Sequence, residues 1–404
     1  MFSLLPTLLI ACTLISSVLT APVPLAPLSL NDATITKVRN NMLQISTHSW
    51  ELGTAAQTDL ELRAPALTVL WPTAFPPPKS LSPVLNASAS GALSIAKRVV
   101  RAKPASSKTL IDGDGAVGDP PSIGTAVLLA NWTRSDPSDQ SFSVAAAQQL
   151  DFLLNDAPRT SDGAISHRKD QTQLWADFVY MVPPFIAYYG ALQGGDDGAN
   201  LLQEAYDQCR LYRKYLLDTG SGLWKHIVLG NWQDNARWGT GNGWAAAGMF
   251  RVLETIRHSS VSSQFQSQTD DLTSWIQQII DNTWKHQNSD GSLRNHLDDE
   301  SSFVDTSSTA LLAAVTYRMA VLTKDTSNVD AADKAFSYIK TQIDSNGWLA
   351  NTVDPLTFTT PSASGSHSPE GQAFVLLLQA AYRDYSLAKS GGVRDMLLAY
   401  IQTR

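Results

Sequence analysis

The sequence predicts an all-α protein whose helices are arranged as a closed ring of hairpins. Three observations predict this fold class. Apolar residues recur at helical spacing from about residue 150 onward, turns containing glycine recur at a nearly constant interval, and no segment alternates polar and apolar residues as a strand would. Helices without a sheet to cover them have to bury their apolar faces against one another.

Amphipathic helices are clearest in three segments. Residues 202–216, 272–284 and 335–343 place apolar side chains at positions i, i+3 and i+4, which gives one apolar stripe on a polar helix. Residues 374–382 are apolar nearly all round, which indicates a helix that is covered on every side. These two kinds of helix predict an outer layer of amphipathic helices around an inner layer of apolar ones.

A turn containing glycine follows the amphipathic helices. Glycine adopts the left-handed conformation at a helix end without strain, and the glycines in question are separated by 59, 69 and 56 residues: Gly163, Gly222, Gly291 and Gly347. After each turn comes a polar loop and then a more apolar helix, starting near Trp175, Trp244, Thr309 and Gln372. An interval of this length holds two helices and two loops, which is one helical hairpin.

About six hairpins fit the chain, and their inner helices would close an α/α toroid; an open solenoid is the alternative. Segments starting at Gly53 and Gly124 are the expected inner helices of the first two hairpins. Between residues 22 and 120 we expect mostly loops, because prolines interrupt any long helix there: Pro65, Pro72, Pro76, Pro77, Pro78 and Pro83. Nothing separates this segment from the rest, so we expect a single domain over residues 22–404.

The composition excludes several classes of protein. The chain has 43% apolar and 17% charged residues, as globular proteins do, and its net charge of −7 without a basic patch argues against nucleic-acid binding. No spacing of Cys and His suits a metal, there is no Ser/His/Asp elbow, and the glycine-rich residues 239–243 lack the preceding strand of a nucleotide-binding loop. We therefore expect neither a metal nor a cofactor.

The N-terminal segment predicts export. Residues 1–21 are expected to be a signal peptide, because residues 4–19 are apolar and nearly uncharged and small residues follow them; no later segment is apolar for long enough to cross a membrane. Asn86 and Asn131 each begin a glycosylation acceptor of the Asn-x-Ser/Thr type. The signal peptide would carry away one of the two cysteines, which leaves Cys209 as a buried thiol. We expect a secreted, extracellular monomer.

Candidate functional residues gather in two runs. Residues 173–185 hold one carboxylate, Asp177, in an apolar and aromatic segment, and a buried carboxylate usually titrates high, caps a helix or takes part in catalysis. Residues 236–244 combine glycines with tryptophans, whose rings suit the C–H faces of sugars. In a closed ring the loops and inner-helix starts share one face, so one funnel would collect His167, Asp177, His226, Trp238, Asn242, Trp244, Asp305 and Glu370.

Each of these residues also has a purely structural interpretation. Asp177 can cap a buried helix, His167 and His226 can be hydrogen-bonded loop residues, and Trp175 and Trp238 can belong to the core.

These motifs resemble those of the six-hairpin glycosidases, in particular the unsaturated rhamnogalacturonyl and unsaturated glucuronyl hydrolases, and most closely their secreted fungal homologues. The resemblance runs from about Trp50 to Tyr385. It is carried by Asp162-Gly163 with His167, by Leu174-Trp175-Ala176-Asp177, by Gly222-Leu223-Trp224 with His226, by Trp238 with Gly241-Asn242-Gly243-Trp244, and by Asp305-Thr306-Ser307.

The resemblance implies an (α/α)6 barrel that removes the terminal unsaturated uronic acid left by polysaccharide lyases. Asp177 matches the catalytic aspartate, which would protonate the C4=C5 double bond so that water adds at C5, without a metal or a covalent intermediate. His226 would lie near the reacting ring and Trp244 would stack on it. Asp119 is the candidate second carboxylate, and further candidate substrate-binding residues are His167, Trp175, Trp238 and Asn242.

One position departs from the family pattern. The family has Trp-x-Arg-Gly-Asn in the second run, whereas this chain has Thr240 in place of the arginine. Because that arginine lies close to the substrate in the family, the change predicts altered specificity, a neutral sugar as substrate or lost activity, unless Arg237 replaces it.

The leading hypothesis is hydrolysis of the terminal unsaturated uronic acid from lyase-generated pectin oligosaccharides of the rhamnogalacturonan type. One alternative is an ordinary glycoside hydrolase on the same fold that uses two carboxylates such as Asp177 and Asp305. The other is a secreted carbohydrate-binding protein without activity. An oligosaccharide is the expected partner in all three cases.

Overall fold

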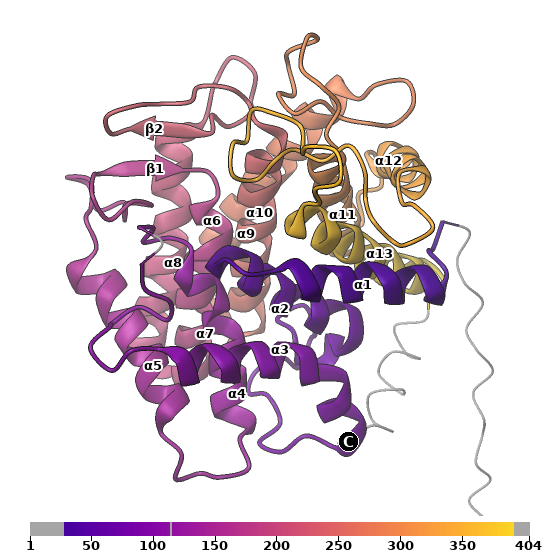
Figure 1. The fold of residues 1–404 in the computed structure, drawn as a ribbon. Coiled ribbons are helices and arrows are strands. Elements are labelled where there is room, and N and C mark those ends of the chain that lie inside the picture. The colour runs from indigo at the N-terminus through magenta and orange to yellow at the C-terminus, as the bar shows by residue number, and fades with distance from the viewer. Residues whose placement is uncertain (1–27, 114, 392–404) are drawn as a thin grey trace, which may run out of the picture.

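The computed structural model describes residues 28–113 and 115–391, so the predicted signal peptide at residues 1–21 lies outside the described residues. Helices dominate the described part of the chain (Figure 1). They are α1 (Asp32–Ile45), α2 (Ser49–Arg63), α3 (Pro83–Ala102), α4 (Gly124–Thr133), α5 (Ser141–Asp151), α6 (Phe178–Met181), α7 (Pro183–Gln193), α8 (Gly195–Leu216), α9 (Gly239–His258), α10 (Gln266–Thr283), α11 (Thr306–Thr323), α12 (Val329–Thr341) and α13 (Pro369–Lys389).

The inner helices form a closed ring. Helix α2 contacts α4, and the contacts continue through α7, α9, α11 and α13 back to α2. Five outer helices pack chiefly on the inner helix before them: α3 on α2, α5 on α4, α8 on α7, α10 on α9 and α12 on α11. The sixth, α1, packs on the last inner helix, α13. The predicted toroid of six hairpins is therefore confirmed. An open solenoid is excluded, because the last inner helix returns to the first.

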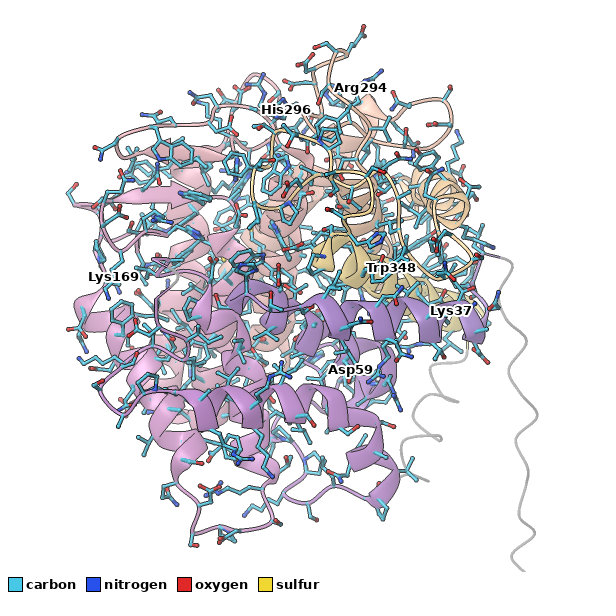
Figure 2. The ribbon with its side chains drawn as sticks, viewed as in Figure 1. Lys37, Asp59, Lys169, Arg294, His296 and Trp348 are labelled. Carbon is cyan, nitrogen blue, oxygen red and sulfur yellow. The ribbon has the colours of Figure 1, made fainter. Side chains whose placement is uncertain are left out.

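Burial separates the two layers as the sequence predicted. Residues 239–256 of α9 and residues 306–320 of α11 are buried all round, whereas the outer helix α8 buries only one stripe. The thiol of Cys209 lies on that stripe and is free and fully buried, as expected. Exposed side chains such as those of Lys37 and Lys169 project from the outer surface (Figure 2).

The glycine turns have the predicted conformation. Gly163, Gly222, Gly291 and Gly347 all have φ between +73° and +101°, in the left-handed region. A short antiparallel sheet, missed by the sequence analysis, joins two of the loops that follow these turns: β1 (Gln173–Trp175) pairs with β2 (Ile227–Leu229), with Trp175 opposite Ile227. Two strands of three residues are too short to give an alternating pattern. Their pairing brings His226 close to Asp177.

The expectation that residues 22–120 are mostly loops was wrong. Helices α1, α2 and α3 lie in this segment, and α3 is 20 residues long. None of the six prolines interrupts a helix: Pro83 is the first residue of α3, Pro65 follows the end of α2, and the other four lie in the loop between these two helices. Proline is tolerated at a first helical position because its missing N–H would have no intrahelical partner there.

Other sequence predictions concern the surface. Asn86 is exposed in the first turn of α3, whereas Asn131, in α4, is only partly exposed and its Oδ1 is shielded from solvent. Among the described helices none is both long and apolar enough to span a bilayer. Within residues 28–113 and 115–391, no cluster of three or more His, Cys, Asp or Glu side chains could hold a metal ion.

Candidate active site

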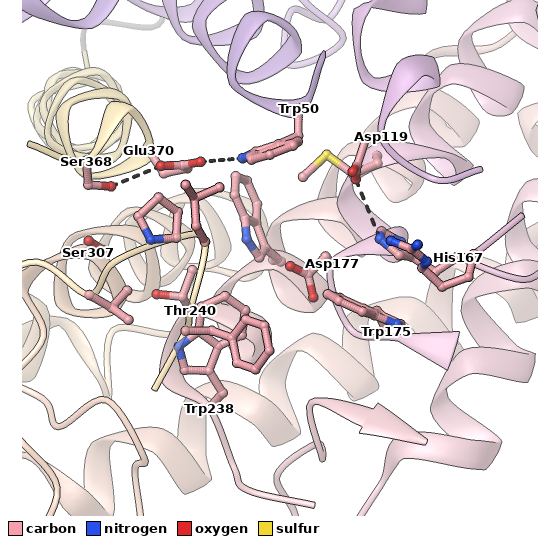
Figure 3. A pocket seen from close by; sticks show the side chains of 17 residues that line it. Trp50, Asp119, His167, Trp175, Asp177, Trp238, Thr240, Ser307, Ser368 and Glu370 are labelled. Carbon is pink, nitrogen blue, oxygen red and sulfur yellow. Dashed lines mark hydrogen bonds and ion pairs between the residues drawn. The ribbon is translucent and has the colours of Figure 1, made fainter. Parts of the chain in front are cut away.

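A cavity of about 220 Å³ opens at the end of the ring where the inner helices begin (Figure 3). Every inner helix contributes a lining residue from its start or from the segment just before it. These residues are Trp50 for α2, Asp119 for α4, Asp177 for α6 and α7, Thr240 for α9, Ser307 for α11 and Glu370 for α13. The predicted funnel therefore exists, because a ring of hairpins brings all inner-helix starts to one face.

Asp177 faces the cavity and does not cap its helix. It precedes α6, yet its side chain makes no capping hydrogen bond and is 17% exposed. Its Oδ2 lies 3.4 Å from Nε2 of His226. Burial is the largest influence and would raise the pKa of Asp177, but His226, together with His167 and a backbone N–H, outweighs burial and the pKa is lowered. The interpretation of Asp177 as a helix cap is therefore excluded.

His226 links two carboxylates. Its side chain is fully buried, and its Nδ1 lies 2.9 Å from Oδ2 of Asp234 while its Nε2 faces Asp177. Burial lowers the pKa of His226, but Asp177 and Asp234 together raise it above its usual value. The three side chains thus form a row in which the imidazole sits between two anions. Asp234 was not predicted, because one acidic residue in a polar loop looks like any solvated residue.

A second pair of side chains lies on the other side of Asp177. Nε2 of His167 is 3.7 Å from Oδ1 of Asp119, and two backbone bonds, from the N–H groups of Val117 and Gly118 to the carbonyl of His167, hold the two segments together. The His167 ring stacks on Trp175 with centroids 4.8 Å apart. Burial lowers the pKa of His167 to about 4, so this histidine is neutral at physiological pH.

Aromatic rings form much of the cavity wall. The predicted residues Trp175, Trp238 and Trp244 all line it, and so does Trp50, which the sequence analysis did not single out. Nε1 of Trp238 donates to Oδ1 of Asn295 at 2.9 Å, which fixes the ring. Trp238 and Trp244 therefore belong both to the core and to the cavity wall, whereas the partly exposed Trp175 belongs to the cavity wall alone.

Three of the predicted substrate-binding residues do not line the cavity, and one of them is the fully buried His226. The Asn242 amide accepts from the Trp224 N–H and donates to the carbonyls of Trp224 and Trp238, so it ties two loops together and does not line the cavity. Arg237 forms an ion pair of 2.7 Å with Asp298 and does not line the cavity either. Their expected role in substrate binding does not agree with this placement.

Asp305 is a helix cap. Its carboxylate accepts hydrogen bonds from the N–H groups of Ser307, Ser308 and Val353 and from the Thr240 hydroxyl, and the residue is fully buried. A carboxylate held by four donors is unavailable to a substrate. The alternative that paired Asp177 with Asp305 as catalytic carboxylates was therefore wrong.

The cavity has one strong cation and three acidic groups. Among its described lining residues, Arg168 is the only Lys or Arg, and the sequence analysis missed it. Besides Asp119 and Asp177, Glu370 lines the opposite side, where the Trp50 indole and the Ser368 hydroxyl both donate to its carboxylate (Figure 3). Burial, reinforced by Glu51, raises the pKa of Glu370 to about 7.

Comparison with known proteins identifies the family. Residues 119–364, more than half of the chain, match the sequence profile of Glycosyl Hydrolase Family 88. The chain belongs to this family. It is also 25% identical over 228 residues to the unsaturated rhamnogalacturonyl hydrolase YesR of Bacillus subtilis (strain 168), over 51% of this chain and 61% of that protein. The family 88 chain thus aligns with about three fifths of this curated relative's length.

Solved structures show the same fold. A possible member of the GH105 family from Klebsiella pneumoniae subsp. pneumoniae MGH 78578 superposes with a TM-score of 0.68 at 19% identity, over 87% of this chain and 93% of that one. The unsaturated glucuronyl hydrolase of Bacillus sp. GL1, responsible for the degradation of glycosaminoglycan, superposes with a TM-score of 0.55 at 14% identity, over 87% and 94%. The six-hairpin toroid is shared with these proteins.

Proposed function

We propose that this family 88 chain removes the terminal unsaturated uronic acid from lyase-generated pectin oligosaccharides. The observation that carries the proposal is Asp177, a carboxylate that faces a sugar-sized cavity, caps no helix and lies 3.4 Å from a histidine held by a second aspartate. A rhamnogalacturonan-type substrate is supported by the name of the Bacillus relative. The apolar N-terminal segment supports secretion of the protein.

In this proposal Asp177 and His226 share the proton that starts the reaction. The raised pKa of His226 and the lowered pKa of Asp177 favour a resting imidazolium beside a carboxylate. As substrate binds, the proton passes to Asp177 and from there to C4 of the C4=C5 bond, which leaves positive charge at C5 next to the ring oxygen. Water adds at C5 and its extra proton returns to Asp177. The hemiketal then opens to a C5 ketone, and the C1 hemiacetal releases the remaining chain as an alcohol.

Arg168 binds the uronate carboxylate in this scheme. Thr240 stands where the family has an arginine, and the Thr240 hydroxyl is bonded to Asp305. Arg237 does not line the cavity, whereas Arg168 does. Arg168 is itself paired with Asp170 through its Nε, at 3.3 Å, so its terminal N–H groups are the ones that can bind a carboxylate. Glu370, with its pKa near 7, is mostly uncharged at mildly acidic pH and then does not repel the uronate.

A second candidate function is a two-carboxylate hydrolase that uses Asp177 as base and Asp119 as acid. The lowered pKa of Asp177 favours it, because an ionised carboxylate is ready to activate water. The two functions differ in substrate, since this one acts on saturated sugars.

The test is the ultraviolet absorbance of the enol ether in oligosaccharides made by a rhamnogalacturonan lyase. We expect the parent protein to remove the band and Asp177→Asn to do so at least roughly 100-fold more slowly. Hydrolysis of saturated oligosaccharides, with the enol-ether band unchanged, would instead support the two-carboxylate mechanism. If the protein neither removes the enol-ether band nor hydrolyses saturated oligosaccharides, both functions are refuted.

A further inference from the structure

An exposed indole lies at the mouth of the cavity. Trp232, in the loop between β2 and α9, is 44% exposed. Its ring meets Trp175 edge to face with centroids 5.5 Å apart and lies parallel to Phe358, with centroids 6.3 Å apart and planes within 3°. Trp175 and Phe358 both line the cavity, so Trp232 extends its aromatic wall outward into solvent.

Two exposed apolar side chains lie at this mouth. The described residues include four large apolar side chains that are well exposed, and two of them, Trp232 and Leu356, lie here. An apolar surface beside a cavity generally indicates a binding region. Because the aromatic face carries partial negative charge, it attracts the C–H face of a sugar ring.

The loop holding Trp232 is fixed by hydrogen bonds to β1 and to the segment just before it. The Gln173 side chain donates from Nε2 to the Trp232 carbonyl at 2.6 Å and accepts from the Trp175 indole at 2.8 Å. The N–H of Asn231 donates to Oε1 of Gln171 at 2.7 Å. One glutamine therefore sets the relative position of the inner and the outer indole.

Phe358 is held in an unfavourable backbone conformation. Its φ of +48° lies in the left-handed region, where the Cβ of a residue other than glycine crowds the backbone. Its N–H donates to the Asp354 carbonyl at 2.8 Å, and its own carbonyl accepts from Nδ2 of Asn295 at 2.9 Å. This conformation keeps the phenyl ring between Trp232, Trp175 and His226.

We propose that Trp232, together with Phe358, forms a second sugar-binding subsite that takes the next pyranose ring of the oligosaccharide whose terminal sugar occupies the cavity. The cavity of about 220 Å³ is smaller than the 300 Å³ or so at which pockets for larger ligands begin, so it holds one monosaccharide. The rest of the chain has to leave through the mouth, past Trp232. The proposal rests on the proposed function for the orientation of the substrate.

The test compares ligands of different length. Binding to the full chain carrying Asp177→Asn, which prevents turnover, is measured by calorimetry with galacturonic acid and with the unsaturated rhamnogalacturonan disaccharide and tetrasaccharide. We expect Trp232→Ala to weaken binding of the disaccharide and tetrasaccharide roughly five- to tenfold and to leave galacturonic acid unchanged. Trp232→Phe, which keeps an aromatic face, should lose less.

Trp275→Ala is the matched control. This tryptophan lies on the outer helix α10 and is partly exposed, packed against Tyr206, so its loss should change no affinity. If Trp232→Ala weakens the binding of all three ligands equally, the proposed subsite is refuted, because Trp232 would then only support the cavity. So would unchanged affinities, or no binding of any ligand to the Asp177→Asn chain. A parent that binds with this length dependence but leaves the enol-ether band intact would refute the proposed hydrolysis and keep the subsite.

Discussion

Glu370 makes the stability of this protein depend on pH in a way that one substitution removes. The residue lies in the first turn of α13 and is 4% exposed, and its carboxylate accepts from Trp50 and, at 3.0 Å, from Ser368. Burial raises its pKa, and the nearby Glu51 raises it further, to about 7 from an ordinary value of 4.5. No Lys or Arg appears among its hydrogen-bond or ion-pair partners in the described residues.

The size of this pH effect follows from the difference between the pKa of Glu370 in the folded chain and its ordinary value. Each pH unit of difference in pKa is worth about 1.4 kcal/mol, so the interval from 4.5 to about 7 corresponds to about 3 kcal/mol. Below pH 4.5 Glu370 is protonated in the folded and in the unfolded chain and contributes nothing. Between pH 4.5 and 7 the folded chain keeps a proton that the unfolded chain has released, so stability falls as the pH rises. Above pH 7 the loss is complete.

Glu370→Gln keeps the shape and removes the titration. We expect the free energy of unfolding of the variant, relative to the parent, to rise by about 3 kcal/mol between pH 4 and pH 8, with most of the change between pH 4.5 and 7. Urea unfolding at four pH values measures it, and taking the difference cancels the contributions of all other groups. Glu300→Gln, at an exposed loop position, is the control and should give a flat difference. Parallel stability curves for Glu370→Gln and the parent would refute the reasoning.

Two further predictions concern the reaction. Arg168→Ala should raise the KM for unsaturated oligosaccharides roughly tenfold or more with kcat nearly unchanged. Arg237→Ala, which breaks the ion pair with Asp298, should leave KM as it is. Steady-state kinetics of both variants checks this prediction, and equal KM values for the two variants would contradict it. Asp234→Asn removes one of the two anions that raise the pKa of His226, so the alkaline limb of the kcat/KM profile should move to lower pH. An unshifted limb in the pH–rate profile would show that His226 does not supply the proton.

The sequence alone predicted more of the fold than of the candidate active site. Four glycines at a constant interval, together with the helical periodicity, predicted the repeat of hairpins, since a left-handed turn after each outer helix is a local requirement. They left open whether the hairpins form a ring or an open solenoid, which depends on contacts between the first and the last inner helix. Helix α3 was not predicted because Pro83 was interpreted as a helix break, although proline is suited to a first helical position. Arg168 was not predicted because its role depends on segments far away in the chain, which no local pattern records. Asp234 was not predicted because an acidic residue in a polar loop looks like any solvated residue, although its partner His226 is only eight residues away.

Polar residues in a motif pose a different difficulty, since a motif does not tell a ligand contact from an internal hydrogen bond. Asn242 and Thr240 both lie in the glycine-rich run, but the first bonds the backbone of a neighbouring loop and the second bonds Asp305. Buried polar groups have to be hydrogen-bonded, and either kind of partner satisfies this requirement equally well. Only the structure shows which partner is present.

The clearest example is the pair of aspartates at the starts of two inner helices. Asp305 accepts from two N–H groups of α11, from Val353 and from Thr240, so its charge serves the helix end and its neighbours. Asp177 precedes α6 in the same way but caps nothing, and it faces the cavity and His226 instead. A helix start exposes N–H groups that an aspartate readily satisfies, so an aspartate that leaves them aside is held in place by other contacts. Here the β1–β2 pairing, which brings His226 to it, supplies those contacts, and the carboxylate stays available to a ligand.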